Sequence, residues 1–402
     1  MKSRNIKKII LIVFNIIILL IGGLLLYNDY RIKHAKVIVI LKKPLTAEVF
    51  SEKKVSDYLA KINGTLLRNE KIDTSKIGKT KVRFRYKNDD GIIISYTFDI
   101  DVKDTVKPTV SKKKSLTLYE GYDGNIMDNF FCGDNYDDNV RCYITGDYDV
   151  NKVGIYPVTF EAVDSSDNRE SYDFNINIIK NYNNYSNDID KSQDYTYFSD
   201  VLRKYKTNNR KIGIDVSKWE GNIDFEKTKK AGVEFAYIRV GHQKGINGEY
   251  ILDPYFKQNM EGFKNQNIKV GVYFFSHARS EEEAIRQANW VYRQIKDYNI
   301  NLDVVFDWEN WEGFSEYKIS FYNLTNVANA FIKNISSKGY SGMLYSSKFY
   351  LENVWFNTDG NIWLAHYTEN TDYTGNYKVW QVCENGKIDG IEDTVDIDIM
   401  YS

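Results

Sequence analysis

Residues 305–309, Val305-Phe306-Asp307-Trp308-Glu309, decide how the C-terminal half of this sequence folds. An apolar run ends there in two acids that one tryptophan separates. β-Branched and aromatic residues favour strands, and side chains at i and i+2 of a strand face the same side. The stretch therefore predicts a buried strand that presents the carboxyl groups of Asp307 and Glu309 together at its end.

Similar apolar runs recur on both sides of this stretch and alternate with segments of helical pattern. The sequence Ser280-Glu281-Glu282-Glu283 indicates a capping box that opens a helix, and residues 316–337 predict a longer helix. This alternation predicts an α/β domain, a (β/α)8-like barrel over residues 210–402. The expected strands are 212–216, 234–240, 268–275, 302–307, 341–345, 361–366, 377–382 and 394–398.

Acidic residues stand near the ends of several expected strands. In a (β/α)8 barrel the carboxyl ends of the strands meet at one face, where active sites lie. A single acid at a strand end is commonly a helix cap. Several acids at one rim instead indicate chemistry, because like charges in a dry site repel. The four acids concerned are Asp215, Asp307, Glu309 and Asp396.

The spacing of Asp307 and Glu309 is the sharpest feature of the set. Two carboxyl groups so placed interact, and the pKa of one is pushed upward. An acid that keeps its proton near neutral pH can protonate a glycosidic oxygen. Nearby rings suit stacking on sugar faces, although most aromatic rings pack in cores. These rings are Tyr273, Phe275, Trp308, Trp311, Trp363, Tyr367 and Trp380.

Seven motifs, in order along residues 211–402, resemble the glycoside hydrolases of family 25, the N,O-diacetylmuramidase lysozymes. They are Gly213–Ser217, Phe235–Arg239, Gly271–Phe275, Val305–Glu309, Trp363–Tyr367, Trp380-Gln381 and Val395-Asp396. The resemblance implies cleavage of the β-1,4 bond between N-acetylmuramic acid and N-acetylglucosamine in peptidoglycan, without a metal or other cofactor.

The resemblance also implies roles for single residues. Glu309 matches the general acid, Asp307 its partner carboxylate, and Asp215 and Asp396 the two other acids of the site. The residues expected to contact the sugar are Arg239, Tyr273, Phe275, Trp308, Tyr345, Tyr367, Trp380 and Gln381.

Two positions depart from the pattern of the family. Glu220 stands where Gln is usual, and Asp398 stands where Asn is usual. Both add negative charge near the site, so they are expected to raise the pKa of Glu309, shift the pH optimum or alter substrate preference.

Three mechanisms remain open at this point. Inversion needs a water between carboxyl groups roughly 6.5–9.5 Å apart, and direct retention needs a carboxylate nucleophile at about 5–5.5 Å. In substrate-assisted retention the acetamido oxygen of the sugar attacks, and Asp307 orients it. The Asp-x-Glu arrangement resembles glycosidases that work in this third way, which we therefore favour.

The N-terminal part of the chain begins with an apolar run, Ile9 to Tyr27, which basic residues precede. Nineteen residues at about 1.5 Å each come close to the roughly 30 Å core of a bilayer. A basic N-terminal flank favours a cytoplasmic N-terminus. We expect residues 1–36 to be a tail and single-pass signal anchor, with the following domains extracellular; a cleaved signal peptide is the alternative.

Residues 72–102 align with residues 148–178 without a gap, and both contain alternating apolar positions separated by a turn-like stretch. This pattern predicts a hairpin used twice, in all-β sandwiches over residues 37–105 and 106–180. The phrase that joins them, residues 102–110, resembles the junction between bacterial immunoglobulin-like domains, which implies a spacer. Residues 181–209 are expected to form a linker, with a short helix over 195–205.

Two cysteines, Cys132 and Cys142, flank an acidic loop in a compartment that permits disulfides, so we expect a bridge between them and a buried thiol at Cys383. The acids of this loop, Asp134, Asp137 and Asp138, lack the Gly and Glu of a calcium loop. A solvated loop is expected there. The sequence contains neither a CxxC nor an HExxH motif, so no metal site is predicted.

Composition limits the partners. The net charge is −1, from 54 basic and 55 acidic residues, and gives no field for nucleic acid. The expected partners are peptidoglycan strands and, through residues 9–27, the cytoplasmic membrane. Alternative interpretations are a non-catalytic wall-binding protein, a metal-dependent polysaccharide deacetylase, and a surface protein in which the sandwiches have the main role.

Overall fold

The computed structural model describes residues 2–180 and 195–401. The chain is multidomain and divides into two compact units, Met1–Thr105 and Val106–Ser402. The first unit begins with α1 (Lys2–Lys33), which contains the expected apolar run. From Ile12 to Lys33 this helix is long and apolar enough to cross a membrane, properties that a signal sequence shares.

The remainder of the first unit is all-β. A four-stranded sheet has the order β2 (Thr46–Glu48), β8 (Ile93–Lys103), β7 (Gly78–Asn88) and β5 (Gly64–Leu66). Two small pairs accompany it, β1 (Val39–Leu41) with β4 (Leu59–Ile62), and β3 (Lys53–Lys54) with β6 (Lys71–Ile72). Val82, Phe84 and Tyr86 on β7 are buried while their neighbours along the strand are exposed, so period-two patterning forms this core.

The second unit begins with a similar β domain, residues 106–180. Its sheet has the order β10 (Ser115–Tyr119), β14 (Arg169–Ile179), β13 (Gly154–Val163) and β12 (Arg141–Thr145), and β9 (Thr109–Val110) pairs with β11 (Cys132–Gly133). Gly78 pairs with Val102 in the first domain and Gly154 with Ile178 in the second. The repeat seen in the sequence is therefore a hairpin repeated in the same register.

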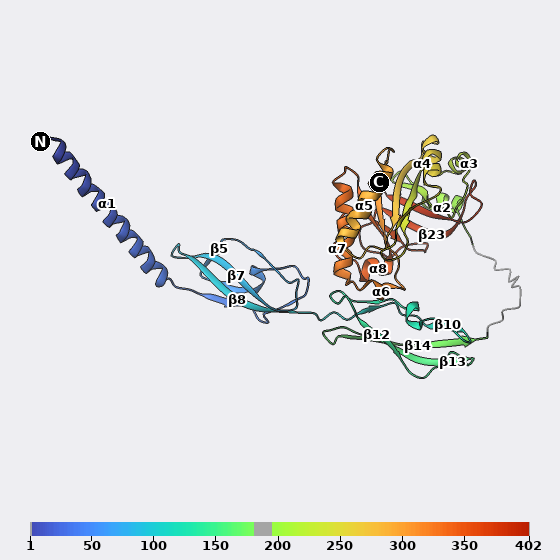
Figure 1. Cartoon of the computed structure of the whole chain (residues 1–402), viewed down its shortest axis with the longest axis horizontal. Coiled ribbons are helices and arrows are strands. Elements are labelled where there is room, and N and C mark those ends of the chain that lie inside the picture. The colour runs from blue at the N-terminus through green and yellow to red at the C-terminus, as the bar shows by residue number, and fades with distance from the viewer. Residues whose placement is uncertain (1, 181–194, 402) are drawn as a thin grey trace. The chain divides into compact units, whose positions relative to one another are not determined.

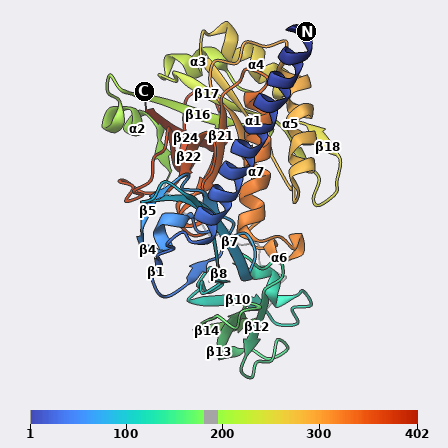
Figure 2. The same ribbon diagram turned by 90° about the vertical axis from the view of Figure 1, so that its left-hand side faces the viewer.

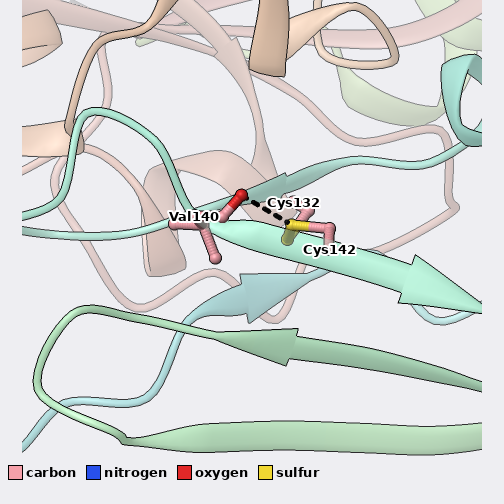
Figure 3. The surroundings of a disulfide bond; sticks show 3 residues. All are labelled: Cys132, Val140 and Cys142. Carbon is pink, nitrogen blue, oxygen red and sulfur yellow. Dashed lines mark hydrogen bonds between the residues drawn. A yellow bond between two sulfur atoms is a disulfide. The ribbon is translucent and has the colours of Figure 1, made fainter.

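A disulfide joins Cys132 on β11 to Cys142 on β12 (Figure 3). The carbonyl oxygen of Val140 lies 3.6 Å from the sulfur of Cys142. The bridge closes the loop between these strands. Cys383 is a buried free thiol.

A closed sheet of eight strands forms the C-terminal domain. Around the barrel the order is β23, β22, β21, β20, β19, β17, β16 and β24, and β24 pairs with β23 to close the ring. All eight strands lie where the sequence predicts them. Their bounds are β16 (Arg210–Val216), β17 (Phe235–Gln243), β19 (Lys269–Phe275), β20 (Val304–Asp307), β21 (Gly342–Ser347), β22 (Asn361–Ala365), β23 (Val379–Lys387) and β24 (Val395–Tyr401).

The barrel departs from a regular (β/α)8 arrangement at its last strand. β24 runs antiparallel to both β16 and β23, whereas the other neighbours are parallel. Residues 388–394 between β23 and β24 are too few for a crossover helix, since parallel connections need about a dozen residues or more. The chain therefore turns back as a hairpin, and Asp396 stands at the beginning of its strand, not at the end.

Helices α4 (Phe256–Asn265), α5 (Glu281–Ile295) and α7 (Phe321–Ser336) lie on the outside of the barrel (Figures 1 and 2). The predicted helix over 316–337 is broken into α6 (Phe314–Tyr317) and α7. Lys318 is in the left-handed region, with φ of 49°, and the Ser320 side chain accepts the Asn323 N–H as the cap of α7. The shorter elements are α3 (Phe225–Lys230), α8 (Lys348–Asn353), β18 (Tyr250–Leu252), η1 (Val55–Tyr58) and η2 (Ile126–Asn129).

The expected linker, residues 181–209, is only partly described, because residues 181–194 lie outside the described residues. The rest belongs to the barrel domain. β15 (Thr196–Tyr197) pairs with β23, and α2 (Phe198–Tyr205) buries Phe198 and Val201 in the barrel core. The short helix predicted over 195–205 is present, but it packs against the domain and does not extend the linker.

Thiol counting checks the disulfide. With Cys132 and Cys142 bridged, unfolding in denaturant without reductant should expose one reactive thiol per chain, that of Cys383, and reductant should raise the count to three. Cys383→Ser should bring the first count to zero. Three thiols before reduction would contradict the bridge.

Candidate active site

The four acids expected from the sequence lie at one end of the barrel. Asp215 on β16 and Asp396 on β24 are register partners. Asp307 is the last residue of β20, where Phe275 on β19 and Tyr345 on β21 are its neighbours across the sheet. β20 ends at Asp307, so Glu309 lies just beyond the strand. The spacing of the two acids had instead predicted that both lie on one face of the strand.

Gln381 on β23 connects the acids to two tyrosines. Its Nε2 donates to Oδ2 of Asp215 at 2.8 Å and to Oδ2 of Asp396 at 3.2 Å. Its Oε1 accepts the hydroxyl protons of Tyr345 and Tyr367, at 2.8 and 2.9 Å. These four bonds saturate the buried amide, so they fix its orientation and hold Asp215 and Asp396 close together.

Asp398, two residues along β24 from Asp396, is fully buried, and its Oδ1 accepts the Trp363 Nε1 proton at 2.8 Å. Burial, and then the charge of Asp398, raise the pKa of Asp215 well above its usual range. Burial and the charge of Asp215 raise the pKa of Asp396 to about 9. These carboxyl groups keep protons near neutral pH because the ionised forms would be desolvated and would repel one another.

The two departures from the family pattern act on Asp215. Glu220 accepts the Ser217 N–H at 2.5 Å, and its charge adds to that of Asp398 in raising the pKa of Asp215. Apart from burial, the charge that raises the pKa of Glu309 comes from Glu384, an exposed residue. The expectation that Glu220 and Asp398 raise the pKa of Glu309 is therefore wrong, because both act on Asp215.

Asp307 and Glu309 form a pair with unequal environments. Asp307 is buried, and the side chain of Glu309 is open to solvent but surrounded on most sides by protein. Burial raises the pKa of both groups, and their contact raises that of Asp307 further. Among the described residues, Oδ1 of Asp307 has no hydrogen-bond donor other than the neighbouring Glu309 carboxyl. The pair can therefore hold a proton next to an accessible oxygen and also offer a buried acceptor.

Arg239 on β17 brings positive charge to the acids. Its Nε donates to Asp253 at 2.8 Å, and the two groups form an ion pair of low exposure. The charge of Arg239 lowers the pKa of Asp307 against the larger effect of burial. Tyr273, across the sheet from Arg239, has its pKa raised by burial and then by the charge of Asp215, so it remains a neutral donor. Arg239 is thus fixed by Asp253 and acts on the site through its field.

The rings that were expected to contact the sugar differ in their exposure to solvent. Tyr367 is 48% exposed, and Phe275 is partly exposed beside Asp307. Trp308 and Trp380 differ from the prediction. Trp308 is 0% exposed and donates to the Ala278 carbonyl, and Trp380 is buried and donates to the His366 carbonyl. Their indole groups are committed to the core, so neither can stack on a sugar.

One exposed ring, that of Trp219, was not predicted from the sequence as part of the site. Trp219, directly after β16, is 70% exposed, and Lys218 Nζ lies 4.4 Å from its ring centroid. A tryptophan in the polar stretch that follows β16 was the signal for it, because a tryptophan there has no core to fill. A cavity of about 460 Å³ also adjoins Tyr367 and is lined by residues of α2, among them Asp200 and Lys204.

Within the described residues, the barrel domain shows no group of three carboxylate, imidazole or thiol ligands with their atoms within 4.8 Å of one another. The acids form hydrogen bonds with Gln381 and Trp363 or contact each other. The arrangement offers proton donors and acceptors.

Residues 214–391 match the sequence profile of the glycosyl hydrolases family 25. The chain is similar to the autolytic lysozyme of Clostridium acetobutylicum, at 27% identity over 189 residues that cover 46% of this chain and 54% of that protein. It is also similar to lysozyme M1 of Streptomyces globisporus, at 26% identity over 206 residues that cover 46% and 65%. The chain spans about half the length of the autolytic lysozyme that it matches.

A solved structure, a family 25 glycosyl hydrolase from Bacillus anthracis, aligns with a TM-score of 0.43 at 20% identity. The alignment covers 49% of this chain and 92% of that one.

The raised pKa of Asp396 predicts a stability that depends on pH. The folded state holds this proton up to about pH 9, whereas the unfolded state releases it near the usual value of 3.8. The contribution is therefore fully present below pH 3.8 and is lost as the pH rises toward 9. Asp396→Asn should raise the melting temperature relative to the unmutated chain more at pH 8 than at pH 5.

Asp389→Asn, at an exposed position of the hairpin before β24, is the matched control and should give the same small change at both pH values. Melting curves followed by circular dichroism at pH 5 and pH 8 would decide. An equal effect of Asp396→Asn at the two pH values would refute the buried, protonated state of this acid.

Proposed function

We propose, from the premise that residues 214–391 belong to the glycosyl hydrolases family 25, that this chain cleaves peptidoglycan. The bond proposed is the β-1,4 linkage between N-acetylmuramic acid and N-acetylglucosamine. The observation that carries the proposal is the Asp307–Glu309 pair at the carboxyl end of β20, beside Asp215 and Asp396. The lysozymes to which the chain is similar support the choice of substrate.

Glu309 is the proposed general acid. Its side chain is accessible to solvent, and burial by the surrounding protein raises its pKa, so it keeps its proton to higher pH than a fully solvated glutamate does. A glycosidic oxygen that approaches this carboxyl can take the proton as the bond to the anomeric carbon breaks. General acid catalysis of this kind contributes about 10²–10⁴-fold.

Asp307 is the proposed partner that orients the substrate. A sugar with a 2-acetamido group can donate its amide N–H to the buried Asp307, whose Oδ1 has no donor among the described residues besides Glu309. This bond would turn the acetamido oxygen toward the anomeric carbon. The oxygen then attacks that carbon as Glu309 protonates the leaving oxygen. The attack closes a ring through the acetamido oxygen, and water then attacks the anomeric carbon and opens this ring. Glu309 takes a proton from that water. The configuration of the anomeric carbon is thereby retained without a protein nucleophile.

The N-terminal helix and the β domains indicate where this activity acts. α1 would anchor the chain in the cytoplasmic membrane as a single pass, and the basic residues before it favour a cytoplasmic N-terminus. Residues 37–402 would then lie outside, where peptidoglycan is. The two β domains, which we interpret as immunoglobulin-like sandwiches, would lie between the anchor and the barrel.

Glu309→Gln tests the acid. The amide keeps the shape but supplies no proton, so turnover should fall by roughly 10²–10⁴-fold while binding of glycan strands stays nearly constant. Turnover is measured as release of reducing ends from purified peptidoglycan, and binding by sedimentation with it. Glu316→Gln, at an exposed position on α6, is the control and should retain activity. Full activity in Glu309→Gln would overturn the assignment of the acid.

Asp307→Asn tests the partner. The rate should fall strongly. The basic limb of the pH–rate profile should move to lower pH, because the second ionisation of the pair no longer meets a negative neighbour. The unmutated chain should also turn over de-N-acetylated peptidoglycan poorly. Efficient cleavage of that glycan would favour a protein nucleophile or base, with Asp215 and Asp396 as candidates.

A further inference from the structure

The second β domain inserts a phenylalanine into the barrel domain. Phe131, next to β11, is 1% exposed and belongs to the hydrophobic core of the barrel domain. Its ring meets five rings of that domain: Trp311, Phe314, Phe321, Phe349 and Tyr350, at centroid distances of 5.1 to 6.3 Å. Phe130 points the other way, into its own β domain, where it packs on Phe160 and Phe174.

The approach at this contact is close enough to require a glycine. A Cβ atom on Gly133 would lie 2.4 Å from a ring carbon of Phe321 and 2.6 Å from one of Phe314. Such distances do not occur between real side chains, so any larger residue would push the two surfaces apart. The contact is therefore fitted at the level of single atoms.

The same loop satisfies the first N–H groups of α7. The Ser320 N–H is bound by Oδ1 of Asp138 and the Phe321 N–H by the carbonyl of Asp134, both at 2.8 Å. Helices leave these groups without partners inside the helix. The expectation of a solvated loop is therefore wrong for Asp134, which is buried, whereas Asp138 is exposed and also binds the helix. We name residues 131–138 the docking loop; the Cys132–Cys142 disulfide ties it to β12 (Figure 3).

Three of the rings that Phe131 meets, Trp311, Phe314 and Phe321, follow Glu309 closely along the chain. The Trp311 N–H donates to the Glu309 carbonyl at 2.8 Å, which forms a tight turn. Trp311 in turn stacks on Tyr350 at 3.8 Å, with an interplanar angle of 12°. Phe131 packs against the edge of both rings, and Lys113 holds Glu312 by an ion pair at 3.0 Å. The path from the docking loop to the Glu309 backbone thus passes through one residue, Trp311.

We propose that the docking loop positions Glu309 for catalysis, so that the second β domain is a working part of the enzyme and not only a spacer. The inference rests on the proposed function of Glu309. Phe131 is its central positioning residue: it holds the Trp311–Tyr350 stack, which fixes the turn at Glu309. The barrel alone would leave this segment without part of its core, and the N–H groups of Ser320 and Phe321 without the acceptors that Asp138 and Asp134 supply.

Positioning predicts a particular kinetic signature. Gln381, Tyr367 and Trp219 lie on other strands or loops than residues 309–321. Loosening that segment should therefore lower kcat and leave KM nearly unchanged. It should also shift the basic limb of the pH–rate profile, because the pKa of Glu309 depends on its burial. A contact that only stabilises the fold would change neither quantity in the folded fraction.

The test compares full-length variants by steady-state kinetics on soluble peptidoglycan fragments, at a temperature where circular dichroism shows each to be folded. Phe131→Ala should lower kcat roughly 10- to 100-fold with KM within about twofold, since small misplacements of a catalytic group have effects of this size. Phe131→Leu should recover part of the loss. Gly133→Ala should resemble Phe131→Ala, because its methyl group displaces Phe314 and Phe321.

Phe130→Ala is the matched control. It removes a ring of similar burial from the core of the same β domain but leaves the contact with the barrel, so kcat should stay within about twofold of the unmutated value in the folded fraction. If Phe131→Ala does not fold, Asp138→Ala, which removes an exposed cap, should still lower kcat and shift the pH profile.

Unchanged kcat and pH profile in the folded docking-loop variants, with an active unmutated chain, would overturn the positioning role. Equal losses in Phe130→Ala and Phe131→Ala would also overturn it, in favour of general destabilisation. An unmutated chain that releases no reducing ends would instead contradict the proposed function.

Discussion

Carboxyl groups crowded at one end of a closed barrel are the constraint on which the rest of this domain depends. Burial and mutual repulsion raise the pKa of Asp215, Asp396 and Asp398. Gln381 and Trp363 supply the donors that hold them. The cluster is therefore tolerable only while protons are retained. Glu309 is different because its side chain remains accessible, which suits the proposed role of proton donor.

This arrangement separates the acids by task. The carboxyl groups of Asp215, Asp396 and Asp398 keep their part of the site neutral and rigid. The hydrogen bonds of Gln381 extend that rigidity to Tyr345 and Tyr367. Asp307 is also buried but contacts Glu309, so it connects these carboxyl groups to the proposed acid. In the proposed positioning role, the second β domain supports Glu309 through Phe131 and Trp311. The proposed position of Glu309 depends on both Asp307 and the second β domain, because Glu309 follows the end of β20.

The sequence predicted much of this structure, for physical reasons that particular residues illustrate. The family assignment is confirmed for residues 214–391, and the eight barrel strands were predictable because buried strands are short apolar runs bounded by polar residues. The antiparallel direction of β24 was missed, since it depends on the length of one connection. Trp308 and Trp380 were assigned to the site because the sequence does not tell whether a ring near the site turns into the core. The contact of Phe131 could not be predicted from the sequence, because it joins residues 180 to 219 positions apart along the chain.

The sugar found at each new reducing end would show which glycosidic bond this chain cleaves. Purified peptidoglycan is digested with the full-length chain, the products are reduced with borohydride, and mass spectrometry identifies the sugar at each new reducing end. We expect reduced N-acetylmuramic acid at every new reducing end. Digestion with the Glu309→Gln variant should give no new reducing ends. Reduced N-acetylglucosamine, or loss of acetyl groups without new reducing ends, would contradict it.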